Sequence, residues 1–293
     1  MTILLAGASG AIGNALVDSL RRDATSLRRL VRRPPQGPDE VQWRPERAEL
    51  PPGALDGVSA VVCLSGANVG SRRWTDEYKQ QLRSSRIEPT TTLARAIAAA
   101  PEPPGVFVCA SAVGYYGDTG ARVISESDPA GDTFLASLCR DWEAAAQAAS
   151  NTSVVHLRTG LVLDRHTGLM ARLVPLFRLG LGGRIGSGDQ YFPWITLADE
   201  IAAIRFLIAR GQPGAFNLTA PNPVTNADFA AALGRAVHRP ALLPVPGFAV
   251  RVALGEFAQD VLSGQRAIPV ALRDAGFEHQ HTTIDAALNA VLS

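Results

Sequence analysis

The sequence contains a single lysine, Lys79, so arginine supplies nearly all of its positive charge. The 28 lysine and arginine residues and the 27 acidic residues leave a net charge of +1. A balance this even provides no general attraction to nucleic acid or to an anionic membrane. We therefore expect neither a nucleic-acid partner nor a membrane partner.

Cysteine and metal-ligand patterns are also scarce. The three cysteines, Cys63, Cys109 and Cys139, lie far apart and include no CxxC pair. An odd and dispersed set argues against a disulfide framework and against a structural zinc site. The five histidines are scattered, and His279 with His281 makes only a weak metal pattern. We expect no metal site.

Long apolar runs are missing as well. No run approaches the roughly 20 residues of a membrane-spanning helix, and Pro175 and Arg178 interrupt the stretch LVPLFRLGLGG. The apolar start MTILLAG leads into glycines without a basic leader or a cleavage site, which predicts a strand rather than a signal peptide. A cytoplasmic location is therefore the expectation.

What the chain does contain is a regular alternation of apolar and helical segments. Its 293 residues are 46% hydrophobic and 19% charged, as in soluble globular proteins. Short apolar runs separated by helices predict an α/β fold, with a doubly wound parallel sheet covered on both faces. The predicted strands cover residues 2–7, 27–33, 58–66, 105–111 and 153–163, and the predicted helices cover 11–22, 76–100 and 131–146.

The second half of the chain is less regular. A glycine-rich stretch, GLGGRIGSGDQYFPW, precedes a helix predicted at 197–210. Thr196 and Thr225 each have an aspartate three residues later, which is the spacing of a capping box. The proline cluster LLPVPGF predicts a boundary between a dinucleotide-binding domain, 1–243, and a small helical domain, 244–293.

The stretch AGASGAIG places Gly7, Gly10 and Gly13 directly after the first predicted strand and at the start of a helix. Glycines suit this position because a pyrophosphate must approach the backbone closely, while the helix N-terminus presents free N–H groups and a positive dipole end. The GxxGxxG spacing is the form used by short-chain dehydrogenases, and its context predicts a dinucleotide site. A tight turn without a ligand is the alternative interpretation.

The second predicted strand ends in Arg32 and Arg33, and no acidic residue occurs between Leu27 and Pro38. NAD sites place a carboxylate here against the ribose 2′-hydroxyl, whereas NADP sites place a cation against the 2′-phosphate. The pattern favours NADP(H). In a chain this rich in arginine, a solvated surface arginine is the alternative.

Longer motifs extend these signals over essentially the whole chain. They are GASGAIG, SRRWTDEYKQQLRSSRIEPT, SAVGYYG, GDTFLASLCRDWEAAA, LRTGLVLD, LGLGGRIGSGDQYFPWI, FNLTAPNPVTNADFAAAL and SGQRAIPVALRDAGF. Together they resemble the epimerase family protein group, atypical extended short-chain dehydrogenases with a C-terminal domain of unknown function. The resemblance implies an extended Rossmann fold, bound NADP(H), and a small-molecule substrate in a pocket built by the C-terminal half. We expect a monomer or a homodimer.

The resemblance also implies positions for the cofactor contacts. The glycine loop would hold the pyrophosphate, and residues closing the second and fourth strands would lie along the adenosine side. An arginine of the long helix would reach a phosphate as a forked donor, and a valine would pack near the nicotinamide. The complete set is Gly7, Ser9, Gly10, Ala11, Ile12, Gly13, Val31, Arg32, Leu64, Ser65, Gly66, Gln81, Arg86 and Val162.

One expected element is missing. Dehydrogenases of this superfamily pass a proton through a tyrosine, and a lysine four residues later lowers the tyrosine pKa and holds the nicotinamide ribose. Aligning Glu143 with the glutamate that commonly follows this lysine places Cys139 at the lysine position and Leu135 at the tyrosine position. Neither YxxxK nor YxxxR occurs anywhere in the chain.

Three hydroxyl groups remain as candidate catalytic residues. Ser111 ends a predicted strand where the superfamily serine or threonine lies, and Tyr115 and Tyr116 follow at the sheet edge where ligands of such folds bind. One tyrosine would donate a proton to a carbonyl; alternatively, both are loop aromatics that pack over the pocket. The aromatic residues of the glycine-rich stretch also have two interpretations. Tyr191, Phe192 and Trp194 form either a wall of the pocket or part of the ordinary buried core.

Two functions are open at this point. The first is an NADP(H)-dependent oxidoreductase or epimerase that acts on a small carbonyl, hydroxyl or sugar-like substrate. The second is a non-catalytic NADP(H)-binding protein with a regulatory or redox-sensing role. The missing tyrosine–lysine pair favours the second function, whereas the retained serine and the paired tyrosines favour the first.

Overall fold

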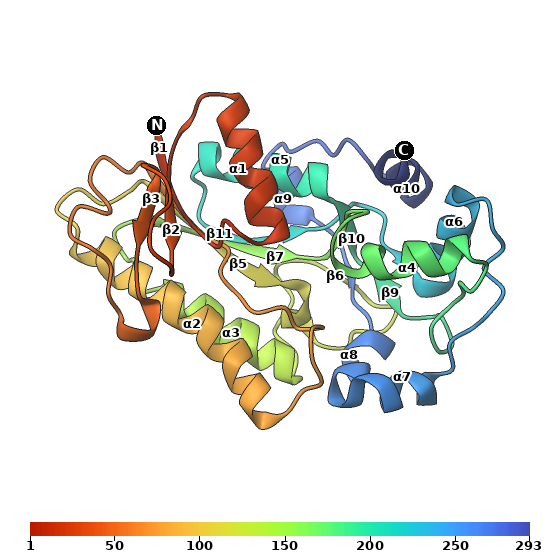
Figure 1. The fold of residues 1–293 in the computed structure, drawn as a ribbon. Coiled ribbons are helices and arrows are strands. Elements are labelled where there is room, and N and C mark those ends of the chain that lie inside the picture. Colours follow the sequence, from red (N-terminus) through yellow and green to blue (C-terminus); the bar gives the residue numbers. More distant parts are fainter.

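A parallel sheet of seven strands forms the centre of the molecule in a computed structural model that describes residues 1–293 (Figure 1). Its strands are β1 (Thr2–Ala6), β2 (Ser26–Val31), β3 (Glu40–Gln42), β4 (Ala60–Cys63), β5 (Val106–Ala112), β7 (Ser153–Thr159) and β11 (Gly214–Leu218). Their order across the sheet is β11-β7-β5-β4-β1-β2-β3, and every neighbouring pair is parallel. The predicted α/β fold with a parallel sheet is confirmed.

Helices cover both faces of this sheet (Figure 1). Because side chains alternate along a strand, β1 contributes to two cores, with Ile3 and Leu5 in one and Leu4 and Ala6 in the other. None of the helices combines the length and the apolarity needed to cross a membrane. The first core is covered by α1 (Ala11–Arg22), α5 (Leu197–Arg210) and α9 (Val270–Asp274), and the second by α2 (Asp76–Ala99) and α3 (Phe134–Ala146).

Both predicted capping positions are confirmed. The Thr196 hydroxyl accepts a hydrogen bond from the Asp199 N–H at the start of α5. The Thr225 hydroxyl does the same for the Asp228 N–H at the start of α6 (Asn226–Ala236). Each cap satisfies a backbone donor that has no partner within the helix, which sets the point where the helix begins.

The strand predicted at 153–163 is divided in two. It forms β7 and a separate strand, β8 (Leu161–Leu163), which pairs with β10 (Trp194–Thr196) outside the main sheet. Gly160 lies at the division, where a Cβ atom would be 2.0 Å from the Pro193 carbonyl oxygen. The close approach of another backbone turns the chain out of the sheet, and only glycine permits it.

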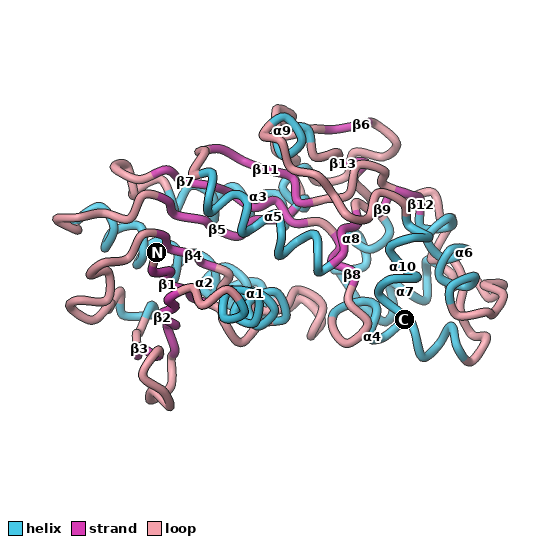
Figure 2. The backbone as a smooth tube through the Cα atoms, turned by 90° about the horizontal axis from the view of Figure 1, so that it is seen from above, coloured by secondary structure: helices cyan, strands magenta, loops and turns pink.

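The segments after β7, apart from α5, β11 and α9, build a smaller lobe beside the carboxyl ends of the sheet strands (Figure 2). Its core contains the fully buried Trp194 and Phe229, between α4 (Gly168–Arg178), α6 and α10 (Ile284–Leu292). The shorter elements of the chain are η1 (Pro45–Arg47), η2 (Val113–Tyr116), β6 (Val123–Ile124), β9 (Tyr191–Phe192), β12 (Val224–Thr225), α7 (Gly247–Leu254), η3 (Gly255–Phe257), α8 (Ala258–Leu262) and β13 (Arg266–Ala267).

The residues of the predicted C-terminal domain, 244–293, contribute to both parts of the molecule. Leu272 and Phe277 pack in the core beneath the sheet, whereas Ile284 and Leu288 pack in the core of the smaller lobe. The C-terminal segment therefore joins the two parts through buried apolar contacts, and the division at 243–244 stays a prediction.

Candidate functional site

The loop between β1 and α1 depends on two glycines. Gly7 has a φ of +88°, and a Cβ atom on it would lie 2.6 Å from the carbonyl carbon of Leu64. A Cβ atom on Gly13 would lie 2.1 Å from the carbonyl oxygen of Gly7. The loop is therefore drawn tightly between the end of β4 and the first turn of α1, a geometry that excludes any side chain at these positions.

Helix α1 begins at this loop without a side-chain cap. Gly10 is the N-cap residue, and no side chain accepts a hydrogen bond from the first helical turn. Ser9, Gly10 and Ala11 are exposed, while Ile12 packs against the sheet core. An exposed and uncapped helix start offers free N–H groups and the positive end of the helix dipole to an anion.

Two neighbouring arginines after β2 have different surroundings. Arg33 donates two hydrogen bonds to Glu40, at 2.7 and 2.8 Å, and these bonds, with one from the Gln36 N–H, lower the pKa of Glu40 to about 2. Arg32 is exposed and forms no hydrogen bond or ion pair within the protein. Arg32 is therefore the one of the two whose guanidinium is free to meet an external phosphate.

Arg86 is a buried cation without an acidic partner. Its guanidinium donates to the carbonyl oxygens of Leu82, at 3.0 Å, and Ala67, at 2.9 Å, and lies 5.0 Å from the ring centroid of Trp142. No carboxylate pairs with it, and burial lowers its pKa. Arg86 lies directly beneath the segment that follows β4. A Cβ atom on Gly66 would be only 3.1 Å from the Arg86 Cζ.

The remaining predicted cofactor contacts lie at the ends of the neighbouring elements. Val31 ends β2, residues 64–66 follow β4, and Val162 lies in β8, half-buried against the sheet core. Gln81 and Arg86 both belong to α2, but five residues separate them, which places them about 140° apart around the helix axis. Gln81 is exposed and Arg86 is buried. The roles of these residues toward a cofactor stay predictions.

A buried ion pair lies where β5 and β7 end. Arg158 of β7 is 5% exposed, and its Nε and Nη2 donate to the two carboxylate oxygens of Glu143, each at 2.9 Å. Ser111 of β5, the register partner of Arg158, donates its hydroxyl proton to the same carboxylate at 2.7 Å. Burial acts to lower the pKa of Arg158, but the bonded carboxylate outweighs it, so the pKa lies above its ordinary value.

Tyr116 belongs to this buried network. Its hydroxyl donates to Asn217 Oδ1 at 2.7 Å and accepts from Arg158 Nη1 at 3.0 Å, and the residue is 3% exposed. Burial raises the pKa of Tyr116 to about 12, although the neighbouring guanidinium opposes the shift. The hydroxyl proton is therefore held inside the protein and has no free path to an external group.

Tyr115 has the opposite environment. It is half-buried, its hydroxyl has no hydrogen-bond partner in the protein, and its ring packs edge-to-face on Tyr116 at 5.3 Å. The guanidinium carbon of Arg158 lies 3.5 Å from the centroid of the Tyr115 ring. A cation this close to the aromatic face holds the ring in place and leaves the hydroxyl available to a ligand.

The two positions of the missing pair are filled by apolar groups. Leu135, at the tyrosine position, packs against the η2 turn, where a Cβ atom on Gly114 would be 3.3 Å from its Cβ. Cys139, at the lysine position, is 3% exposed, and burial together with the nearby Glu143 raises its pKa to about 12. Leu135 has no exchangeable proton, and the Cys139 thiol stays neutral near neutral pH, so neither residue supplies the phenol or the positive charge of the usual pair.

Sequence reasoning assigned no role to the residues that hold this network together. Glu143, Glu126 and Asn217 come from α3, the segment after β6 and β11. Glu126 bonds the Asn217 N–H at 2.9 Å, which joins the loop to the sheet. The sequence did indicate that Arg158 would be paired, because a charged residue within an apolar strand is buried only together with a hydrogen-bonded partner. Its partners are distant in sequence, and no local pattern identifies them.

The aromatic residues of the glycine-rich stretch separate into two groups. Trp194 is fully buried and donates from Nε1 to the Asn222 carbonyl, and Phe192 packs on Phe229 with centroids 5.4 Å apart. Both belong to the core of the smaller lobe. Tyr191 is half-buried, and the guanidinium of Arg266 lies 4.8 Å from its ring centroid.

Metal-ligating side chains do not gather in the structure. No group of three or more histidine, cysteine, aspartate or glutamate side chains has an arrangement that could hold a metal ion. The two histidines of the C-terminal segment instead bond to protein groups: His279 Nε2 lies 2.9 Å from the Thr219 carbonyl oxygen, and His281 Nδ1 lies 3.3 Å from an Asp199 carboxylate oxygen.

Comparison with known families matches most of the chain. Residues 3–219 match the NAD dependent epimerase/dehydratase family, and residues 245–291 match a domain of unknown function, DUF1731. The epimerase family protein ML0860 of Mycobacterium leprae is 50% identical over 293 residues, which cover 98% of this chain and 94% of that protein.

Two solved structures extend the comparison to three dimensions. The human epimerase family protein SDR39U1 (isoform 2), crystallised with NADPH, is 35% identical and superposes with a TM-score of 0.91 over 99% of both chains. A nucleoside-diphosphate sugar epimerase from Corynebacterium glutamicum is 32% identical, with a TM-score of 0.81, and the match covers 100% of this chain and 58% of that one.

Proposed function

This chain belongs to the NAD dependent epimerase/dehydratase family, and from that membership and the geometry of the site we propose that it is an NADP(H)-dependent enzyme. Its reaction is an oxidoreduction or epimerisation of a small carbonyl, hydroxyl or sugar-like substrate. The observation that carries the proposal is the contact between Leu135 and Gly114. It brings the position where the superfamily tyrosine belongs next to the turn that carries Tyr115.

The residues at the sheet edge fit a dinucleotide. The loop between β1 and α1 leaves no room for a side chain at Gly7 or Gly13, and the exposed start of α1 offers N–H groups to a pyrophosphate. Arg32 carries an unpaired guanidinium at the adenosine side, where a 2′-phosphate distinguishes NADPH from NADH. The related human protein, 35% identical, was crystallised with NADPH.

Arg86 adds a second cation to this edge. A buried guanidinium that is bonded only to carbonyl oxygens retains its full charge, since no carboxylate neutralises it. Such a group is stabilised when an anion approaches, and its planar fork suits a phosphate. In the proposed function Arg86 binds the cofactor from beneath the segment 64–66.

Two hydroxyl groups act on the substrate in this proposal. When NADPH is bound, its nicotinamide supplies a hydride to the carbonyl carbon. Tyr115 gives its hydroxyl proton to the carbonyl oxygen, which becomes the product hydroxyl. Arg158 lies against the Tyr115 ring and stabilises the negative charge that remains on it. In the reverse direction Tyr115 takes the proton back as the substrate hydroxyl is oxidised.

Ser111 has a positioning role. The residue is 4% exposed and its proton is directed to Glu143, so a ligand group that reaches its oxygen must donate the hydrogen bond. Ser111 therefore orients a substrate hydroxyl and is not the proton donor. Tyr116, whose hydroxyl is already bonded on both sides, supports the network around Arg158.

The test is a substrate panel of aldehydes, ketones and nucleoside-diphosphate sugars, with NADPH consumption followed by nicotinamide absorbance. For an active substrate, Tyr115→Phe is expected to lower kcat by about 100-fold or more while the Kd for NADPH stays unchanged. Full activity in Tyr115→Phe contradicts the assignment of the proton donor. Tight NADPH binding without turnover of any compound supports the non-catalytic regulator, which the apolar Leu135 and Cys139 favour.

A further inference from the structure

One face of the smaller lobe gathers most of the exposed apolar side chains of this protein. Ten large hydrophobic side chains are exposed, and eight of them come from residues 176–181 and 242–252. The exposed fractions of Leu179, Leu242 and Val252 are 73%, 76% and 71%. We call this set the apolar face; its members are Leu176, Leu179, Leu181, Leu242, Leu243, Val245, Phe248 and Val252.

Backbone hydrogen bonds hold the two segments of the apolar face side by side. The Leu243 N–H donates to the Gly182 carbonyl at 3.1 Å, and the Val245 N–H donates to the Arg184 carbonyl at 2.8 Å. Helix α7 follows directly and contributes Phe248 and Val252, which are four residues apart and therefore share one side of the helix. Figure 1 shows α4 at the right of the molecule and α7 below it, at the lower right.

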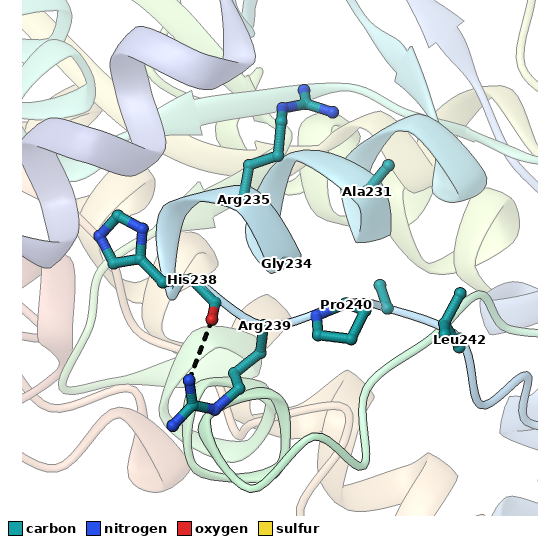
Figure 3. Close-up of a pocket in the computed structure, with 8 residues that line it drawn as sticks. Ala231, Gly234, Arg235, His238, Arg239, Pro240 and Leu242 are labelled. Atoms are coloured by element: carbon teal, nitrogen blue, oxygen red, sulfur yellow. Dashed lines mark hydrogen bonds between the residues drawn. The ribbon is translucent and has the colours of Figure 1, made fainter.

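Two shallow hollows adjoin this face. The larger, of about 560 Å³, lies between α6 and the segment 238–242, as Figure 3 shows, with Arg235, His238 and Arg239 among its lining residues. The smaller, of about 260 Å³, shares Leu242 with it and adds Arg184. No acidic side chain lines either hollow.

Three exposed arginines within the segments of the apolar face have no acidic partner. The segments 165–188 and 229–255, which build this side of the lobe, contain seven arginines. Acidic residues flank these segments at Asp164, Asp189, Asp228 and Glu256, and Arg235 pairs with Asp285 at 2.6 Å. Arg178, Arg239 and Arg251 are exposed, and none of them forms an ion pair. The apolar face is therefore bordered by three positive charges that no acidic side chain of the protein pairs with.

We propose that the apolar face docks on a membrane surface that contains anionic lipid. Large exposed apolar patches mark interaction sites. The rim of three unpaired arginines, Arg178, Arg239 and Arg251, matches lipid phosphates, while side chains such as Phe248 and Leu242 enter the interface. A second copy of this chain is a poorer occupant, because a two-fold contact would place the arginine rim against itself. Docking of this kind needs no membrane-spanning helix.

The experiment is vesicle sedimentation of the full chain. Vesicles of phosphatidylcholine alone are compared with vesicles that also contain phosphatidylglycerol, at low and high salt. Binding is expected only to the anionic vesicles and is expected to weaken at high salt. Phe248→Ser with Val252→Ser should lower the partition coefficient at least tenfold, and Arg251→Ser should lower it about fivefold.

Matched controls separate docking from folding. Val123→Ser removes another exposed apolar side chain and Arg140→Ser another exposed arginine, both outside the apolar face; both variants should bind like the wild type. Thermal unfolding checks that every variant is folded. Absence of binding to anionic vesicles, or equal binding to both kinds, overturns the proposal. A dimer in solution that Phe248→Ser with Val252→Ser converts to a monomer also overturns it, in favour of a second copy as the occupant.

Discussion

Glu143 of α3 and Arg158 of β7 form a two-pronged ion pair, with both N–O distances at 2.9 Å, at the point where β5 and β7 end. The pair is nearly inaccessible to water, since the side chains are 13% and 6% exposed. Two further groups, Ser111 and Tyr116, bond to its members. The arrangement of the candidate catalytic residues therefore depends on this one pair.

Loss of the negative charge in this pair should destabilise the protein strongly. Glu143→Gln keeps the shape of the side chain but leaves Arg158 buried without a counter-charge, which costs about 3–5 kcal/mol. The matched control is Asp141→Asn on the same helix, because Asp141 pairs with Arg83 at a partly exposed site. That change should cost less than about 1 kcal/mol. Urea denaturation at pH 7 measures both, and equal losses would contradict the structural role of the buried pair.

The two adjacent tyrosines should differ in their effect on stability. Tyr116→Phe removes the donor to Asn217 and an acceptor of Arg158, both buried, and should lower the free energy of unfolding by about 1–3 kcal/mol. Tyr115→Phe removes a hydroxyl without a protein partner and should change it by less than about 0.5 kcal/mol. Denaturation of both variants beside the wild type measures the difference, and the reverse ranking would show that the hydrogen-bond assignments are wrong.

Glu200 should make stability depend on pH. The residue is fully buried, its Oε1 accepts from the Thr159 hydroxyl at 2.9 Å, and its Oε2 has no partner. Burial raises the pKa of Glu200 from 4.5 to about 8, while the bond from Thr159 opposes the shift. The folded protein therefore keeps a proton that the unfolded chain releases above pH 4.5, and stability falls as the pH rises from about 4.5 to 8.

Glu200→Gln should remove this part of the pH dependence. From pH 5 to pH 8 the wild type should lose on the order of 3–4 kcal/mol more than the variant, measured as free energies of unfolding at the two values. Glu88→Gln, a change at an exposed glutamate of α2, is the control and should follow the wild type. A Glu200→Gln profile parallel to that of the wild type would mean that Glu200 is charged in the folded state.

Arg32 should determine the preference between the two nicotinamide cofactors. Arg32→Ala is expected to weaken NADPH binding about ten- to hundredfold, the effect of one charge-assisted hydrogen bond, and to leave NADH binding unchanged. Fluorescence titration of the nucleotides measures both affinities. Arg33→Ala is the neighbouring control, because Arg33 is already bonded to Glu40; it should retain the preference. Equal affinities of the wild type for NADPH and NADH would exclude the role of Arg32.

Much of the fold follows from short-range patterns in the chain. Unbroken apolar runs separated by helical segments predict a parallel sheet, because both faces of such strands must be covered. The strands at 2–6 and 106–112 and the caps at Thr196 and Thr225 lie where these patterns place them. Gly7 and Gly13 were also identifiable in the sequence, because glycines at this spacing between a strand and a helix indicate a loop too tight for side chains. Each of these signals involves residues within a few positions of one another.

The chemistry of the site was decided by contacts that no local pattern contains. Tyr115 and Tyr116 are neighbours of the same type, but only the Tyr116 hydroxyl is bonded within the protein, by Arg158 and by Asn217, which lies 101 residues further along the chain. Arg32 and Arg33 likewise differ because Glu40 reaches only Arg33. The apolar face requires residues near 180 and near 245 to lie side by side. The sequence by itself determined where the strands, the helices and the glycine loop between β1 and α1 form, because these depend on residues close to one another in the chain. The tertiary structure determined which hydroxyl and which cation have no partner in the protein, and which apolar surface stays exposed. Burial and pairing depend on contacts between segments that are far apart in the sequence.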